Sequence, residues 1–356
     1  MSNKDVRQMV EDLKVIVKNI VGDESLQAIE TIIPTQIDIL DIFAGGGFAL
    51  GTFVTLAGLP HAGKSTLAIQ IAANVQKLYP DAIVIYFDTE NAVTTYRLQE
   101  LGIDTDRLIF VSKDITIEDI FETIDDFIAY KERNNVVDIP YIVIWDSIAL
   151  TTTKRAAAGE EIQNTDGMIR AKVLTEYLNR YVGKFNKYNI LVLAVNQLRE
   201  KIQMMYQGAG VSIKGLGNYS IPGGSIVYYA SFHMLMMKID SFLSEETYGF
   251  SGALINCSFA KNKLAKPHEP FKLVLDYDKG FSNFWTYYMY MKDMKLIKAG
   301  AWNSMEGYSK KFRTKEALTL FQTDEEFRNA FLKQAEVVKQ ELSKKIPKYV
   351  TENKQE

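Results

Sequence analysis

The chain has 356 residues, a length that accommodates one large α/β domain with smaller attachments. Hydrophobic residues make up 47%, charged residues 24% and the formal net charge is −3, so the composition excludes a globally basic protein and leaves any nucleic-acid binding to local segments. The single Cys257 excludes an intramolecular disulfide and a cysteine-based metal cluster and fits a reducing cytoplasm, and no apolar run approaches the roughly 18 residues that span a membrane.

Near the N-terminus, apolar residues recur at helical spacing from Val6 to Ile20. This pattern predicts an amphipathic helix, whose apolar face must be buried either on its own domain or on a neighbouring subunit. A short segment that holds Pro34 follows. Residues 1–33 are therefore predicted to form this helix and a linker, and in the second case the helix is an oligomerisation helix.

The next region predicts a strand at 52–57 and a helix at 66–78, with a glycine-containing loop between them. The loop fits the phosphate-binding pattern G-x-x-x-x-G-K-[ST], which here comprises Gly58, Leu59, Pro60, His61, Ala62, Gly63, Lys64 and Ser65, with Thr66 following. Its backbone N–H groups and the helix N-terminus would hold a phosphate, Lys64 would reach the β- and γ-phosphates, and Ser65 would ligate Mg²⁺. The alternative is an incidental glycine-rich turn.

Strands and helices then alternate. Predicted strands cover 82–88, 107–112, 141–146 and 190–196, and predicted helices cover 93–101, 117–131 and 168–188. Such alternation, with near-continuous apolar strands, predicts a parallel sheet that helices cover on both faces. Three more predicted strands, 226–239, 253–261 and 271–277, should extend the sheet in antiparallel fashion.

These patterns divide the chain into a core at 34–282, a smaller mixed domain at 283–345 with a charged helix from about 324, and a polar tail at 346–356. The predicted fold is therefore an α/β core with a mostly parallel sheet, antiparallel strands at one side, an N-terminal helix and a small C-terminal domain.

Acidic and amide side chains follow several of the predicted strands. The strand 141–146 ends in Asp146, the form of a Walker B strand, whose carboxylate would hold Mg²⁺; a capping role is the alternative. Glu90 follows the strand 82–88 and could orient and polarise a water, or could be a solvated loop acid. Gln197 ends another strand, where its amide can donate to a γ-phosphate.

Two long segments follow strands at the same edge. Residues 198–222 combine glycines with cations and aromatic rings, which suits single-stranded nucleic acid: Arg199, Lys201, Tyr206, Lys214 and Tyr219. Residues 151–167 carry Lys154 and Arg155 among mixed charges. For both segments the alternative is a mobile surface loop. Lys261 and Lys263 close a predicted strand, where they could be solvated or could reach an anion on an adjacent subunit.

This set of motifs resembles the RecA family of DNA strand-exchange ATPases, which includes bacterial RecA and the phage UvsX-type recombinases. The resemblance runs from about 33 to 302 and is carried by Leu40-Asp41-Ile42, Gly45-Gly46-Gly47, Phe87-Asp88-Thr89-Glu90-Asn91-Ala92, Leu101-Gly102-Ile103-Asp104, Asp146-Ser147-Ile148-Ala149-Leu150, Asn196-Gln197-Leu198-Arg199, Pro222-Gly223-Gly224, Tyr229-Ala230-Ser231, Lys261-Asn262-Lys263 and Ala299-Gly300-Ala301-Trp302.

The resemblance implies that Glu90 activates water, that Gln197 senses the γ-phosphate, and that Lys261 and Lys263 act in trans on a neighbour's ATP. It also implies that 151–167 and 198–222 are DNA-binding loops and that the helix 6–20 packs on the adjacent protomer. Further correspondences place the first loop's basic positions loosely at Arg170 and Lys172, the second loop's exit at Gly223 and Gly224, and the adenine-stacking position at Arg97, with Tyr96 beside it. The lysine that bacterial members carry after the two glycines is missing here, where Val227 and Tyr228 stand.

The implied function is an ATP- and Mg²⁺-dependent recombination protein. It would form helical filaments on single-stranded DNA, with ATP between protomers, pair that strand with homologous duplex DNA and hydrolyse ATP in response to DNA. A recombination mediator or single-stranded DNA-binding protein is an expected partner, no membrane is involved, and the expected location is the cytoplasm. The alternatives are a ring-forming helicase or branch-migration ATPase, against which the lysine pair speaks, and a non-catalytic, ATP-bound DNA-coating protein.

Overall fold

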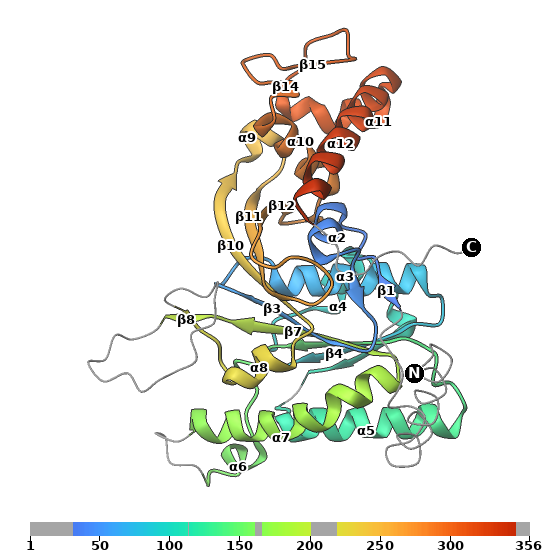
Figure 1. Cartoon of the computed structure of the whole chain (residues 1–356), viewed down its shortest axis with the longest axis vertical. Coiled ribbons are helices and arrows are strands. Elements are labelled where there is room, and N and C mark those ends of the chain that lie inside the picture. The colour runs from blue at the N-terminus through green and yellow to red at the C-terminus, as the bar shows by residue number, and fades with distance from the viewer. Residues whose placement is uncertain (1–30, 113, 161–165, 201–218, 347–356) are drawn as a thin grey trace, which may run out of the picture.

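The structure is a computed structural model that describes residues 31–112, 114–160, 166–200 and 219–346. The predicted N-terminal helix and most of the predicted polar tail lie outside the described residues. Figure 1 shows a large twisted sheet with helices on both faces and a helical lobe at one end of it. The predicted α/β class is confirmed.

Nine strands form the main sheet, in the order β13-β12-β11-β10-β3-β7-β6-β4-β5. Their bounds are β3 (Phe53–Gly58), β4 (Ile83–Asp88), β5 (Leu108–Val111), β6 (Tyr141–Asp146), β7 (Ile190–Gln197), β10 (His233–Leu243), β11 (Gly252–Asn262), β12 (Pro270–Asp276) and β13 (Gly280–Phe281). The strands from β10 to β5 are parallel to their neighbours, and β11, β12 and β13 pair antiparallel.

The parallel strands are buried on both sides because successive side chains enter different cores. On β7, Leu191 and Leu193 pack into the core that contains α3 (Lys64–Leu78), whereas Val192 and Ala194 pack into the core under α5 (Ile117–Arg133) and α7 (Asp166–Lys187). Figure 1 shows α3 on one face and α5 and α7 on the other. This arrangement puts the carboxyl ends of the parallel strands at a single edge.

The predicted strand at 226–239 is wrong in its first half. Residues Ser225–Ala230 form helix α8, and β10 begins only at His233. The β-branched and aromatic residues suggested a strand, but Gly223 and Gly224 both have positive φ angles and turn the chain, and Val227 is buried in the core under α7. Because helix α8 precedes β10, β10 can lie parallel to β3. The expected antiparallel extension therefore starts one strand later, at β11.

Shorter elements connect the layers. They are β1 (Ile32–Ile33), α2 (Asp38–Ala44), β2 (Phe48–Ala49), α4 (Thr95–Glu100), a 3-10 turn (Thr105–Arg107), α6 (Lys154–Ala157), β8 (Arg199–Glu200) and β9 (Tyr219–Ser220). Helix α4 begins two residues later than the predicted helix 93–101, because the Thr94 hydroxyl caps it by accepting from Arg97 N.

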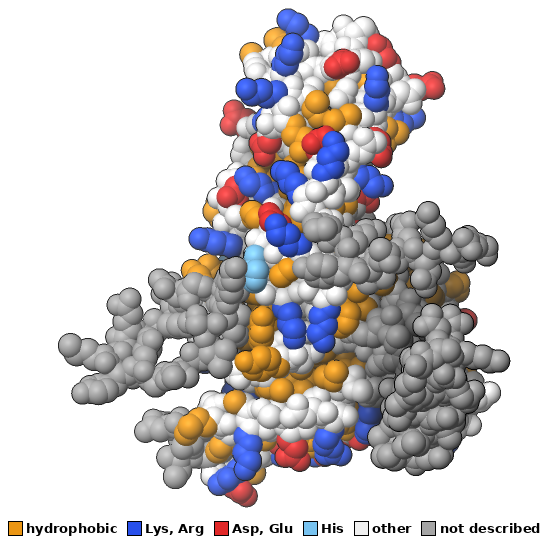
Figure 2. Space-filling view, viewed as in Figure 1, with side chains coloured by type: hydrophobic (Ala, Val, Ile, Leu, Met, Phe, Trp, Pro, Cys, Tyr) orange, Lys and Arg blue, Asp and Glu red, His pale blue; other side chains and the backbone are white. Residues whose placement is uncertain are grey.

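The C-terminal lobe contains α9 (Glu245–Tyr248), α10 (Asn283–Asp293), β14 (Ile297–Lys298), β15 (Ser304–Met305), a 3-10 turn (Thr314–Glu316), α11 (Ala317–Thr323) and α12 (Glu325–Lys345). Its core is continuous with the α3 side of the sheet, since Phe331, Tyr288 and Leu273 belong to one buried cluster. Basic and acidic side chains are interspersed over the lobe (Figure 2), in keeping with the small net charge.

Candidate functional site

The glycine-containing loop joins β3 to α3, and its backbone geometry needs the two glycines. A Cβ on Gly58 would lie 2.3 Å from the Met237 carbonyl oxygen, closer than real Cβ atoms approach. Gly63 has a φ of 78°, and a Cβ there would meet Leu275 Cδ2 at 2.7 Å. The loop therefore closes tightly on β10 and β12, with Lys64 as the first residue of α3.

Lys64 is held inside this loop. Only 7% of the residue is exposed, and its Nζ donates to the Leu59 carbonyl oxygen at 2.8 Å. Burial lowers the pKa of Lys64, and the nearby carboxylates of Asp146 and Glu90 partly offset that effect. The ammonium group thus sits between the loop backbone and two acids, where an anionic ligand would gain strongly from it.

Asp146 ends β6, next to Asp88 at the end of β4. Its Oδ2 accepts from the Tyr86 hydroxyl at 2.8 Å, while its buried Oδ1 has no hydrogen-bond partner among the described residues. Burial raises the pKa of Asp146 to about 6; hydrogen bonding from Ser65 and Tyr86 lowers it. An orphaned carboxylate oxygen beside a serine hydroxyl suits a hard cation such as Mg²⁺.

The described residues contain no cluster of three or more His, Cys, Asp or Glu side chains that could hold a metal by themselves. Proteins usually bind Mg²⁺ through one or two carboxylates together with phosphate oxygens and water. Ser65 and Asp146 therefore fit a magnesium ion that arrives with a nucleotide.

Glu90 lies at the centre of a polar network. Its Oε1 accepts from Ser147 Oγ at 2.8 Å and from Gln197 Nε2 at 2.8 Å. The turn that carries Glu90 is held by Asp88, whose carboxylate accepts from Glu90 N at 3.2 Å and Val93 N at 3.0 Å. Three strand ends, β4, β6 and β7, thus bring a carboxylate, a hydroxyl and an amide into contact.

A cavity of about 730 Å³ opens over this network. Its lining combines the loop residues with the acids and with apolar side chains from the antiparallel side of the sheet: Pro60, His61, Gly63, Lys64, Ser65, Thr66, Glu90, Asp146, Val195, Gln197, Ile239, Phe242, Leu275 and Tyr277. The structure therefore brings most of the predicted nucleotide and catalytic residues together.

Two predicted residues, Tyr96 and Arg97, are not part of this lining. The Arg97 guanidinium donates to the carbonyl oxygens of Tyr277 at 2.7 Å and Asp278 at 2.6 Å, and Tyr96 is 70% exposed. Instead, Phe242 and Tyr277 supply the aromatic surface of the cavity. Neither was predicted from the sequence, although Tyr277 ends the predicted strand 271–277 and Phe242 lies three residues beyond the predicted strand 226–239.

Lys261 and Lys263 lie away from the cavity of their own protomer. Lys261 Nζ donates to the carbonyl oxygens of Tyr228 at 2.9 Å and Tyr229 at 2.7 Å, at the end of α8. The Lys263 ammonium lies 5.3 Å from the centroid of the Phe232 ring. Burial, followed by repulsion from Lys263, lowers the pKa of Lys261 to about 8.

The residues predicted for DNA binding are distributed over two neighbouring segments. Lys201, Tyr206 and Lys214 lie outside the described residues, but Arg199 pairs with Ser220 and Glu200 with Tyr219, so β8 and β9 form the stem of the second segment. Leu198 N donates to the Gly58 carbonyl oxygen at 3.1 Å, which connects this stem to the glycine-containing loop.

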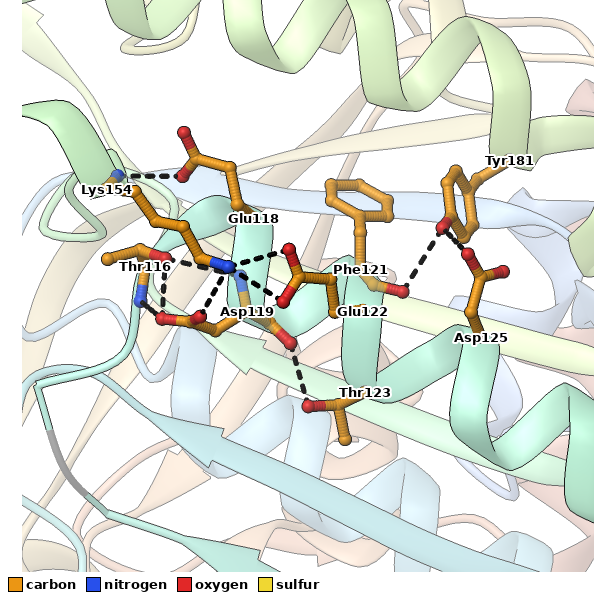
Figure 3. A network of polar contacts seen from close by, with 9 residues as sticks. All are labelled: Thr116, Glu118, Asp119, Phe121, Glu122, Thr123, Asp125, Lys154 and Tyr181. Carbon is orange, nitrogen blue, oxygen red and sulfur yellow. Dashed lines mark hydrogen bonds and ion pairs between the residues drawn. The ribbon is translucent and has the colours of Figure 1, made fainter.

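Arg155 of the first segment and Lys172 of α7 are exposed, and both Lys154 and Arg170 have protein partners. Lys154 forms ion pairs with acids of α5 (Figure 3), and the Arg170 guanidinium donates to the Ala149 carbonyl oxygen at 2.8 Å. Gly223 and Gly224, at the exit of the second segment, face Leu174 and Ala171 of α7. The two predicted DNA segments therefore meet at α7.

Comparison with known proteins decides the family. The family model described as "RecA N-terminal domain" matches residues 12–282. The chain belongs to the RecA family. Family membership supports a recombinase, and a DNA-dependent ATPase is a family-level inference.

Curated RecA proteins resemble the chain over most of their length. "Protein RecA" of Xanthomonas campestris pv. campestris (strain B100) is 32% identical over 285 residues, which are 80% of this chain and 77% of that protein. "Protein RecA" of Sulfurimonas denitrificans is 29% identical over 287 residues, covering 80% and 76%. Within the described part of this RecA-family chain, no helix is long and apolar enough to cross a bilayer.

Proposed function

We propose that the protein is an ATP-dependent recombinase that assembles into a helical filament on single-stranded DNA and exchanges that strand with a homologous duplex. ATP would be bound between protomers, and DNA would stimulate its hydrolysis. The observation that carries the proposal is the contact between Glu90 and Gln197, because Gln197 is the last residue of β7 before the 198–222 segment. A single hydrogen bond thus joins the candidate hydrolytic carboxylate to a candidate DNA-binding segment.

For nucleotide binding, the N–H groups of the loop between Gly58 and Lys64 would surround the phosphates, with the α3 N-terminus behind them. Lys64 would exchange its bond with the Leu59 carbonyl for the β- and γ-phosphate oxygens. Ser65 and Asp146 would hold Mg²⁺, which neutralises charge on the phosphates when bound. Phe242 and Tyr277 would pack against the base, with Arg97 fixing the backbone at Tyr277.

For hydrolysis, Glu90 would accept a proton from water as the water oxygen attacks the γ-phosphorus and ADP departs. The Ser147 hydroxyl and Gln197 amide both donate to the Glu90 carboxylate. A γ-phosphate would compete with Glu90 for the Gln197 amide, so the position of Gln197 would depend on whether the γ-phosphate is present.

For assembly and DNA binding, we propose that Lys261 and Lys263 reach the nucleotide of an adjacent protomer. The described cations Arg155, Lys172 and Arg199, together with Lys201 and Lys214, would contact DNA phosphates, while Tyr206 and Tyr219 would stack on bases. Loss of the γ-phosphate removes a ligand that favours the DNA-binding state, and DNA affinity falls as a consequence.

An ATPase assay with and without single-stranded DNA tests this proposal. We expect DNA-stimulated hydrolysis in the wild type and none in Lys64→Ala, which lacks the phosphate-binding ammonium. Thr319→Ser, a conservative change at an exposed position of α11 outside the cavity lining, should retain activity. A wild-type protein that binds ATP and DNA but shows no turnover would instead support a non-catalytic coat protein.

A further inference from the structure

The first candidate DNA segment is fixed to α5 at the point where it leaves the sheet. Lys154 opens the short helix α6, and its Nζ lies 2.6 Å and 2.7 Å from the two carboxylate oxygens of Glu122 and 3.2 Å from Asp119 Oδ1. The backbone N–H of the same residue donates to Glu118 Oε2 at 3.0 Å. Figure 3 shows these acids converging on Lys154 from a single helix.

The acids occupy one face of α5 because Glu118, Glu122 and Asp125 are spaced i, i+4 and i+7. Asp125, at the far end of this face, accepts hydrogen bonds from Tyr181 and, at 2.6 Å, from Lys184, both on α7. Helix α7 begins where the segment 151–167 ends. One polar face of α5 therefore holds the entry to the segment through Lys154 and the helix that follows it through Asp125.

Backbone contacts reinforce the attachment at the entry. Thr152 forms a parallel bridge with Thr116, and its carbonyl accepts from Ile117 N at 2.9 Å. Asp119, which pairs with Lys154, also caps α5 by accepting from Thr116 N at 3.0 Å. The Lys154 ion pairs thus join the N-terminal end of α5 to a stretch of chain that already lies alongside it at Thr152.

The same stretch leads back to the nucleotide site. The Thr151 hydroxyl donates to the Ser147 carbonyl oxygen at 2.7 Å and accepts from Trp145 Nε1 at 2.7 Å. Ser147 in turn donates through its own hydroxyl to Glu90. A short chain of hydrogen bonds therefore runs from the Glu90 carboxylate through Ser147 to Thr151, which directly precedes the residues that contact α5.

The ammonium of Lys154 has little capacity left for a phosphate. Its three protons are matched by three carboxylate oxygens within 3.2 Å, and hydrogen bonding to Glu122 raises its pKa. Arg155, the next residue, is exposed and forms no ion pair within the described ranges. The two adjacent cations therefore differ in what they can offer to DNA.

We propose that Lys154 is a positioning residue that fastens the entry of the first DNA segment to the acidic face of α5, and that it is not itself a phosphate ligand. Its role is to keep the residues between Ser147 and Arg155 in the geometry that connects the nucleotide site to DNA. This inference rests on the proposed function, since it concerns how that function's DNA segment is held.

Salt titration of single-stranded DNA affinity separates positioning from phosphate contact. Each phosphate contact to a single strand contributes about −0.7 to the slope of log K against log salt concentration. We expect Lys154→Met to leave this slope unchanged. It should lower the DNA-stimulated ATPase rate about two- to fivefold, which corresponds to the free energy that exposed ion pairs typically contribute. Arg155→Met, the matched control, should reduce the magnitude of the slope by about 0.7.

Two further variants of this ion pair sharpen the test. Glu122→Gln should lower stimulation as Lys154→Met does, whereas Lys154→Arg, which can still pair with Glu122 and Asp119, should retain it. If Lys154 contacted phosphate, Glu122→Gln would free it and tighten DNA binding. A slope reduced by about 0.7 in Lys154→Met, or tighter DNA binding in Glu122→Gln, overturns the proposal.

Trypsin provides a readout that needs no DNA. The attachment should protect the bonds after Lys154 and Arg155 in the wild type, and Glu122→Gln should be cut there faster. Equal cutting together with unchanged stimulation also overturns the proposal. If the wild type does not bind single-stranded DNA, the proposed function fails, while the proteolysis result still decides whether α5 holds the segment.

Discussion

Replacing Asp146 with Asn should stabilise the protein when nucleotide and metal are absent. Burial raises the pKa of this carboxyl from 3.8 to about 6, so the folded state carries a charge that costs it free energy. About two pKa units at 1.36 kcal/mol each give a penalty of about 3 kcal/mol for ionised Asp146. Asn removes the charge, and its side-chain oxygen can still accept from the Tyr86 hydroxyl.

The sign of the pH dependence follows from the raised pKa. Between about pH 4 and pH 6 the folded state binds a proton that the unfolded state has released, so wild-type stability falls as pH rises through this window. The difference in unfolding free energy between Asp146→Asn and wild type should therefore be small near pH 4 and reach its full value above about pH 6.

Unfolding curves in EDTA at several pH values measure this difference. Adding Mg²⁺ and ATP should reverse the order, because ligand at 1,000 times its dissociation constant stabilises the wild type by about 4.1 kcal/mol and the variant lacks the metal ligand. A variant that is less stable than wild type in EDTA at pH 8 would refute the reasoning, since the carboxylate would then contribute net stabilisation to the empty site.

Three further changes test separate parts of the structure. Gln197→Met keeps the size of the side chain but loses the bond to the Glu90 carboxylate, so DNA stimulation of ATPase should fall at least tenfold while ATP binding persists; unchanged stimulation contradicts the coupling. His233 is buried and its pKa is lowered to about 4, so the stability it contributes is present above pH 6.5 and is lost as the pH falls toward 4. His233→Gln should therefore make the melting temperature depend less on pH between 6.5 and 4. An unaltered dependence would contradict this role of His233. Gly58→Ala places a Cβ 2.3 Å from the Met237 carbonyl and should cost about 1–3 kcal/mol in unfolding free energy, whereas Gly167→Ala in α7, with nothing within 4 Å, should be neutral or stabilising; similar melts for the two would disprove the close approach.

The sequence predicted the parallel half of the sheet well because its signals are local. The glycine-containing loop, the apolar strand 141–146 and the helix at 117–131 each have a pattern that their own residues determine, and β3, β6 and α5 appear close to the expected bounds. The contact between Glu90 and Gln197 also follows from such reasoning, since both follow strands that end at the same edge.

The sequence predicted less well where tertiary contacts override local preference. Residues 226–230 have strand-like composition, yet they form α8 because the positive φ angles at Gly223 and Gly224 redirect the chain toward α7. The aromatic lining at Phe242 and Tyr277 depends on how β10 and β12 curve past the loop, which no local pattern encodes. The engagement of Lys154 with α5 is likewise a contact between segments distant in sequence.

At the core of the proposed function, Glu90 activates water for ATP hydrolysis in response to DNA bound by the neighbouring segments. The most direct measurement is the ATPase rate of wild type and Glu90→Gln, each with and without single-stranded DNA, alongside electron microscopy of the same samples. We expect DNA-stimulated turnover in the wild type, and loss of turnover with filaments retained in Glu90→Gln. Undiminished DNA-stimulated turnover in Glu90→Gln would contradict this role of Glu90.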